Sequence, residues 1–73
     1  MTEAEADQRI IKSRETLARY RQGVASVENL PLFTAEIATL EGIAQAHPSK
    51  ATKLARLCND WNDYADLVRG TLH

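Results

Sequence analysis

Residues 54–68, "LARLCNDWNDYADLV", decide the fold class because their apolar side chains recur at steps of three and four. At about 100° per residue, this spacing gathers one set of side chains on a single face of an α-helix. The set is Leu54, Cys58, Trp61, Ala65 and Val68, widened by Leu57 and Tyr64. We therefore predict a long amphipathic helix that buries this face against other helices.

The same stretch carries three carboxylates, Asp60, Asp63 and Asp66, at intervals of three residues. On the helical wheel they spread over the opposite side of the helix and do not converge on one point. A metal site needs several ligands aimed at a common centre, and paired catalytic carboxylates must face one substrate. We therefore predict that these side chains form a solvated surface without a metal.

Two prolines divide the rest of the chain. "ENLP" (28–31) and "AHPS" (46–49) each interrupt a helical pattern, since the residue before a proline is disfavoured in the helical region. No alternating apolar run of strand length is present. The sequence predicts one all-α domain over residues 1–73, a helical hairpin or small three-helix bundle with helices near 3–28, 31–46 and 49–70. Whether the first two are separate helices or one kinked helix stays open.

All three predicted helices have an apolar stripe with three–four spacing. Such spacing favours shallow crossing angles, as in antiparallel bundles and coiled coils. The residues expected to form the core or a dimer interface are Ile10, Leu17, Tyr20, Val24, Phe33, Ile37, Leu40, Leu54, Cys58, Trp61 and Val68.

The predicted helix lengths favour a homodimer. At 1.5 Å per residue, the three helices would measure about 39, 24 and 33 Å. The second is too short to cover the first, so part of the first stripe would be exposed in a monomer. Pairing two protomers along the heptad stripes would bury it, and we expect such a homodimer.

The composition limits partners and compartment. Nine basic residues nearly balance ten acidic ones, with a net charge of −1, so no overall field attracts nucleic acid or an anionic membrane. The start, "MTEAEADQR", is unlike a secretory signal, and no apolar run approaches the ~20 residues of a membrane span. The single cysteine fits a reducing compartment. We expect a cytoplasmic protein that does not contact membranes.

Catalytic patterns are missing from the sequence. It contains no glycine-rich phosphate loop, nucleophile elbow, HExxH or CxxC pattern. Cys58 lies in an apolar stripe, where a buried, unreactive thiol is expected. We therefore predict a non-catalytic protein without a cofactor.

Candidate protein-binding residues lie beside the stripes. Leu57, Tyr64 and Leu67 form a second ridge on the third helix. An aliphatic and aromatic ridge with a charged rim is typical of a protein-binding patch. The alternative is that this ridge is buried within an oligomer.

Charged candidates lie on the first two helices. Arg14 and Arg21 flank the first stripe seven residues apart, either as a solvated flank or as a ridge that docks on an acidic or phosphate surface. Glu36 lies at the margin of the second stripe. A carboxylate there favours an arginine partner, and we expect Arg14 or Arg21 to pair with it.

The small size and the lack of catalytic motifs are similar in style to small accessory proteins of phages and mobile elements, some of which inhibit host regulators. We predict a protein-interaction module that binds and inhibits or modulates a partner protein. In its most specific form it is an anti-activator of a transcriptional regulator, with Glu28, Glu36 and Glu41 facing basic DNA-reading residues.

The alternative function is a small DNA- or RNA-binding regulator. It would use one basic face of the first helix, made of Arg9, Lys12, Arg14, Arg19 and Arg21. Affinity for nucleic acid would then fall steeply with salt, because phosphate contacts release counterions.

Overall fold

The computed structural model describes residues 1–23 and 25–70. Its elements are three α-helices, α1 (Glu3–Gln22), α2 (Leu30–Ala46) and α3 (Ala51–Gly70), and two short 3-10 helices, η1 (Val27–Asn29) and η2 (Pro48–Lys50). The prediction of an all-α bundle of three helices is confirmed. None of the described helices is both long and apolar enough to cross a membrane.

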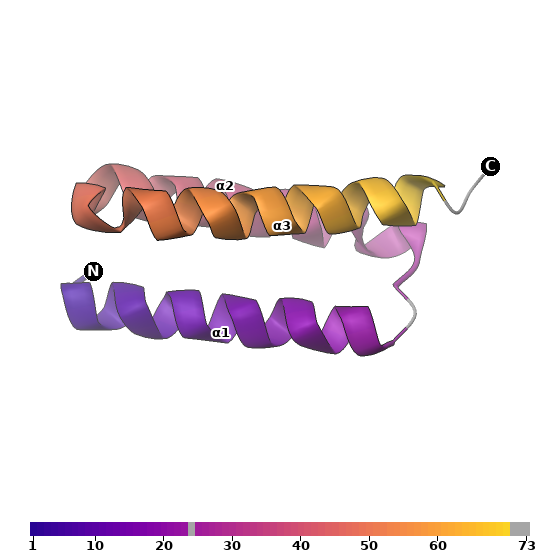
Figure 1. Cartoon of the computed structure of the whole chain (residues 1–73), viewed down its shortest axis with the longest axis horizontal. Coiled ribbons are helices and arrows are strands. Elements are labelled where there is room, and N and C mark those ends of the chain that lie inside the picture. The colour runs from indigo at the N-terminus through magenta and orange to yellow at the C-terminus, as the bar shows by residue number, and fades with distance from the viewer. Residues whose placement is uncertain (24, 71–73) are drawn as a thin grey trace.

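The three helices lie side by side, with α2 running opposite to α1 and α3 (Figure 1). α2 and α3 form the closest pair, and α1 lies along both. The bundle is elongated, with extents of 41 × 18 × 17 Å. The N-terminus therefore lies at the same end as the α2–α3 connection, and the end of α3 lies beside the α1–α2 connection.

The sequence predicted that the first helix ends near residue 28. In the structure it ends earlier, at Gln22. Gly23 is extended (φ −107°, ψ −164°), and its N–H donates to two carbonyls of the last helical turn. Ser26 precedes the next element, η1, and its backbone N–H donates to the side-chain oxygen of Asn29. Val24, which was predicted to continue the stripe, lies outside the described residues.

The earlier end of α1 removes the reason for the predicted homodimer. The helices contain 20, 17 and 20 residues. At 1.5 Å per residue they measure about 30, 26 and 30 Å. They therefore match in length, and α2 is long enough to cover most of α1.

The predicted stripes form the core of a single chain. Their buried members are Ile10, Leu17, Phe33, Leu40, Leu54, Cys58, Trp61 and Val68, with Tyr20 and Ile37 partly buried against them. These residues are covered within one chain. They are therefore not exposed to form the predicted interface between two protomers.

Aromatic side chains from all three helices meet in this core. The ring of Phe33 on α2 lies 5.0 Å from that of Tyr20 on α1, centroid to centroid, and 5.4 and 5.6 Å from those of Trp61 and Tyr64 on α3. The hydroxyl of Tyr64 donates to the backbone carbonyl of Tyr20 at 2.7 Å. The cluster thus buries a large apolar area, while the buried hydroxyl of Tyr64 still has a hydrogen-bond acceptor.

A glycine in the middle of α2 offers a first prediction. Gly42 is exposed, and a Cβ added there would meet no atom within 4 Å. We expect Gly42→Ala to raise the free energy of unfolding by about 0.5–1 kcal/mol, because glycine loses more backbone entropy on folding. Urea unfolding followed by circular dichroism measures this change. A loss of stability would contradict an exposed, regular helix at this position.

Candidate functional site

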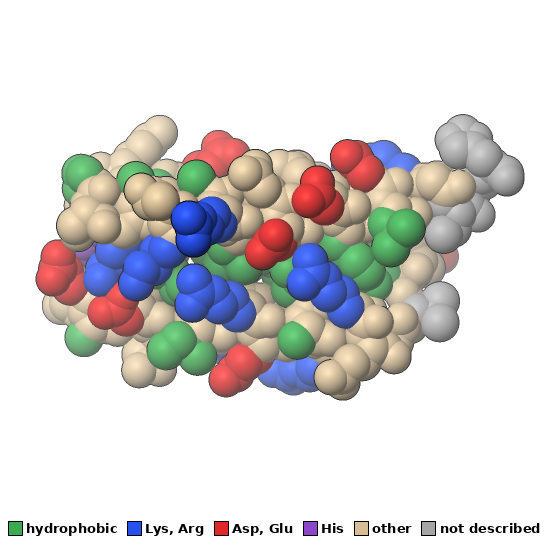
Figure 2. All heavy atoms as spheres, viewed as in Figure 1, with side chains coloured by type: hydrophobic (Ala, Val, Ile, Leu, Met, Phe, Trp, Pro, Cys, Tyr) green, Lys and Arg blue, Asp and Glu red, His purple; other side chains and the backbone are tan. Residues whose placement is uncertain are grey.

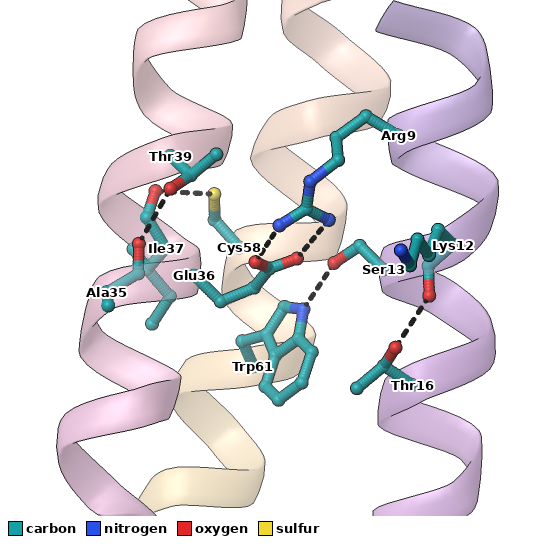
Figure 3. Close-up of polar contacts among 10 residues, drawn as sticks. All are labelled: Arg9, Lys12, Ser13, Thr16, Ala35, Glu36, Ile37, Thr39, Cys58 and Trp61. Carbon is teal, nitrogen blue, oxygen red and sulfur yellow. Dashed lines mark hydrogen bonds and ion pairs between the residues drawn. The ribbon is translucent and has the colours of Figure 1, made fainter.

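A half-buried ion pair joins α1 to α2 (Figure 3). Arg9 donates two hydrogen bonds to the Glu36 carboxylate, one of them 2.7 Å long from Nη1 to Oε2. The Glu36 side chain is 15 % exposed. The predicted pairing of Glu36 with Arg14 or Arg21 is wrong, because both arginines are exposed on the other edge of α1.

A buried hydrogen bond lies next to this ion pair. The indole N–H of Trp61 donates to Oγ of Ser13 at 2.9 Å, and the two residues are 1 % and 0 % exposed. Buried polar groups in proteins are nearly always hydrogen-bonded, which explains a serine inside the apolar stripe of α1. That serine in the stripe was the signal in the sequence from which this contact could have been inferred.

The surroundings of Glu36 fix its charge. Burial by itself would raise the pKa of this carboxyl, but hydrogen bonds from Arg9 and Ser13, with the charges of Arg9 and Lys12, hold the pKa below its usual value. The hydrogen bonds with Glu36 in turn raise the pKa of the Arg9 guanidinium. Glu36 is therefore ionised and already paired, and it does not serve as an exposed carboxylate for a partner.

The ridge predicted on α3 is not a surface. Leu57 and Tyr64 are 3 % and 8 % exposed, and the hydrogen bond from Tyr64 to the backbone of Tyr20 shows that this side of α3 faces α1. On the other side of the stripe, the Cys58 Sγ lies 3.9 Å from a carbonyl oxygen of α2. The stripe of α3 is wide because α3 packs on two helices. Of the predicted ridge, Leu67 is exposed, at 63 %.

One edge of α1 faces α2 and carries Lys12 and Arg19. Lys12 lines a hollow with Leu32 of α2, and Arg19 lines an adjoining one. Thr16 and Tyr20 line both hollows. Lys12 thus lies over a partly apolar hollow between α1 and α2, and Arg19 lies beside the end of α1.

The other edge of α1 faces α3 and carries Arg14 and Arg21. Asp7 identifies this edge as the one that faces α3. Its carboxylate accepts a hydrogen bond of 2.6 Å from Nζ of Lys50, which lies just before α3. Residues seven apart drift by only about 20° around a helix, so Arg14 and Arg21 follow Asp7 along the same edge. The basic residues of α1 predicted as the alternative contact for nucleic acid therefore do not all lie on one face. Arg9 is paired, and the other basic residues lie on two edges.

Basic side chains from α3 join this second edge. Lys53, Asp60 and Leu67 are spaced by seven on the side of α3 that faces α1, and Arg56 is one turn before Asp60. Figure 2 shows basic side chains along the boundary between α1 and α3, with acidic ones among them. We define the α1–α3 surface as the exposed residues Arg14, Arg21, Lys53, Arg56, Asp60 and Leu67, which together carry a net positive charge.

The arginines of the α1–α3 surface are free to bind. The ion pairs of the described residues are Arg9–Glu36, Lys50–Asp7 and Arg69–Asp66. Arg14, Arg21 and Arg56 therefore have no partner within the described part of the chain. An incoming carboxylate would meet guanidinium groups that need not first break another ion pair.

The three aspartates of α3 are solvated, as predicted. Asp60, Asp63 and Asp66 are all exposed, and Asp66 pairs with Arg69 at 3.0 Å. Within residues 1–23 and 25–70, no group of three or more His, Cys, Asp or Glu side chains is arranged to hold a metal ion.

The single cysteine offers a second prediction. Cys58 is 9 % exposed, and burial, with a smaller effect of the Glu41 and Glu36 charges, raises the pKa of its thiol. The thiolate is the reactive form. We expect iodoacetamide at pH 8 to modify the folded protein at least about tenfold more slowly than the unfolded chain. Equal rates in the absence and presence of denaturant would contradict this burial.

No protein-family model, curated protein or solved structure matches the chain. Its function is therefore inferred from the geometry of its surfaces.

Proposed function

We propose that the protein is a non-catalytic interaction module that binds a partner protein through the α1–α3 surface and modulates it. One observation carries this proposal: arginines without an intramolecular partner lie beside a leucine that is 63 % exposed. Arginine is enriched in protein interfaces, and an exposed aliphatic side chain next to it supplies apolar contact. The positive charge favours an acidic surface on the partner. We propose that it acts in the cytoplasm.

The more specific form, an anti-activator that masks a basic DNA-reading surface, relied on three glutamates. Glu36 is paired with Arg9, while Glu28 and Glu41 are exposed on different elements, η1 and α2. At about 100° per residue, Glu41 lies about 140° around α2 from Glu36, so the two side chains do not share one face of the helix. The proposal therefore keeps inhibition or modulation of a partner, such as a transcriptional regulator, and places the contact on the basic α1–α3 surface.

A pair of charge-reversal variants tests this surface. Lys53→Glu with Arg56→Glu changes the α3 side of it. Lys12→Glu with Arg19→Glu makes the same change in charge on the α2 edge of α1 and is the matched control. We expect the first variant to lose at least about tenfold in affinity for the partner, because like charges then face each other, and the control to retain it.

Affinity capture from a nuclease-treated lysate of the source organism, with each variant beside the wild type, identifies the partner by mass spectrometry. Titration of the purified partner then gives the affinities. Equal retention by the two variants, or equal loss, would contradict a contact at the α1–α3 surface. Binding that disappears with nuclease and falls steeply with salt would favour a nucleic-acid partner instead.

Self-association is the second part of the proposal. The heptad stripes are buried within one chain, so a homodimer needs a different surface. The candidate is the outer face of α1, which neither α2 nor α3 covers.

A further inference from the structure

The outer face of α1 has an apolar line along its centre. Ile11 is 45 % exposed, and the exposed alanines Ala4 and Ala18 lie seven residues before and after it. Figure 2 shows separate hydrophobic side chains along α1, with charged side chains between them. The alanines are small enough to let another helix approach closely on both sides of Ile11.

On one flank of this line, the charges are divided between the two halves of the helix, while Lys12, Glu15 and Arg19 lie on the other flank. Glu3 and Asp7 precede Ile11, and Arg14 and Arg21 follow it. At about 100° per residue, all four lie within about 80° of Ile11 and on the same side of it. α1 therefore has an acidic first half and a basic second half along one flank of its outer face.

We propose that a second copy of this chain docks on this face, with the two α1 helices antiparallel and Ile11 packed against Ile11 on the twofold axis. Residue i of one copy then faces residue 22 − i of the other, so Ala4 lies opposite Ala18 of the second copy. A twofold interface of this kind brings the same flank of both helices together.

Charge complementarity selects the antiparallel arrangement. Residue 8 of one copy lies opposite Arg14 of the other, next to Asp7, whose carboxylate also accepts a hydrogen bond from Lys50 of its own chain. Residue 1 lies opposite Arg21, two residues from Glu3. Each contact occurs twice by symmetry. In a parallel twofold pair, opposite flanks of the two helices would lie together, so these contacts between Glu3 or Asp7 and the arginines of the same flank would not form.

This inference rests on the proposed self-association. The dimer engages Arg14 and Arg21 of the α1–α3 surface, so it leaves the α3 side of that surface to the partner. The α3 side of the α1–α3 surface, with Lys53, Arg56 and Leu67, stays exposed in such a dimer. A single pair of helices buries less than the ~800 Å² per partner of a standard interface. We therefore expect dimerisation to be weak and to depend on protein concentration.

Sedimentation velocity over a range of concentrations tests the dimer. We expect Ile11→Asp to weaken dimerisation at least about tenfold, because it places carboxylates against each other on the axis. Leu67→Asp is the matched control, since Leu67 is also an exposed aliphatic residue, more exposed than Ile11, but lies on α3. Circular dichroism checks that both variants fold. A wild type that stays monomeric at millimolar concentration would overturn the proposal, as would equal effects of the two variants.

Disulfide formation tests the orientation. Because Cys58 is buried, Ala4→Cys and Ala18→Cys each add one accessible thiol. In the antiparallel dimer, each variant alone forms little disulfide under mild oxidation, since its two thiols lie at opposite ends of the interface. A mixture of both variants gives the crossed dimer. Efficient disulfide formation by Ala4→Cys alone would overturn the antiparallel arrangement.

The two proposals fail separately. Lys53→Glu with Arg56→Glu is expected to lose the partner and to keep the dimer. Ile11→Asp is expected to lose the dimer and to keep the partner. Loss of both by Lys53→Glu with Arg56→Glu would show that dimerisation needs α3, which would overturn the interface on α1.

Discussion

Replacing Trp61 with alanine is expected to lower the free energy of unfolding by about 3–5 kcal/mol. The indole is 1 % exposed, contacts aromatic rings of α1 and α2, and donates its N–H to Ser13. A chain of 73 residues has a total stability of roughly 4–11 kcal/mol at 0.05–0.15 kcal/mol per residue. The variant is therefore expected to be partly or largely unfolded at 25 °C.

Urea unfolding followed by far-ultraviolet circular dichroism measures this loss, since the tryptophan itself is removed. Trp61→Phe is the control that keeps most of the apolar volume, and we expect it to cost about 1–2 kcal/mol. A cycle of Trp61→Phe, Ser13→Ala and the double variant isolates the hydrogen bond. A cost below about 1 kcal/mol for Trp61→Ala would contradict the position of this ring in the core.

The second large effect is expected at the ion pair between α1 and α2. Glu36→Gln keeps the shape of the side chain but removes its charge, which leaves the Arg9 guanidinium half-buried without a counterion. Breaking a fully buried pair costs about 3–5 kcal/mol, and the partial exposure of Arg9 reduces this to about 1–2 kcal/mol at pH 7. Chemical unfolding at pH 7 measures the difference from the wild type.

The pH dependence of this difference follows from the lowered pKa of Glu36. A carboxyl whose pKa is lower in the folded state stabilises the fold above its usual value of 4.5, and this contribution is lost as the pH falls through the folded-state pKa. The wild type and Glu36→Gln should therefore converge in stability towards pH 3. Glu41→Gln, an exposed change on the same helix, is the control. A difference that stays constant between pH 7 and 3 would contradict the ionised pair.

The sequence was sufficient to predict the fold class and two of the three helices. The predicted ranges 31–46 and 49–70 agree with α2 and α3 because prolines mark both starts. The end of α1 was missed because Val24 and Val27 continue the apolar spacing of the sequence beyond Gly23, although the backbone of Gly23 itself is extended. Apolar spacing shows which face of a helix is buried, but it does not show where the helix stops.

The candidate site was harder to predict because apolar stripes do not determine the handedness of a bundle. Two mirror-related arrangements of three helices bury the same stripes but exchange the neighbours of α1. In the one observed, Arg9 faces Glu36 of α2 and Asp7 faces Lys50 beside α3. In the other, Arg14 would face α2, as was predicted. These polar pairs favour one handedness over the other.

The width of the third stripe carried information that was misread. Leu57 and Tyr64 widen the apolar stripe, but they were also interpreted as part of a ridge that either binds a partner or is buried within an oligomer. A helix in contact with two neighbours needs a wide stripe, and α3 is such a helix. Leu67 lies just beyond this stripe and is exposed, so part of the predicted binding surface persists.

Photo-crosslinking from two matched positions tests the proposed function most directly. Leu67 and Leu32 are 63 % and 57 % exposed, and they lie on the α1–α3 surface and on α2, respectively. Each is replaced in turn by a benzophenone amino acid, and crosslinked products are identified after irradiation in cells of the source organism. A partner at the α1–α3 surface predicts one crosslinked protein from position 67 and none from position 32. The same product from both positions, or a product from position 32 alone, would contradict it.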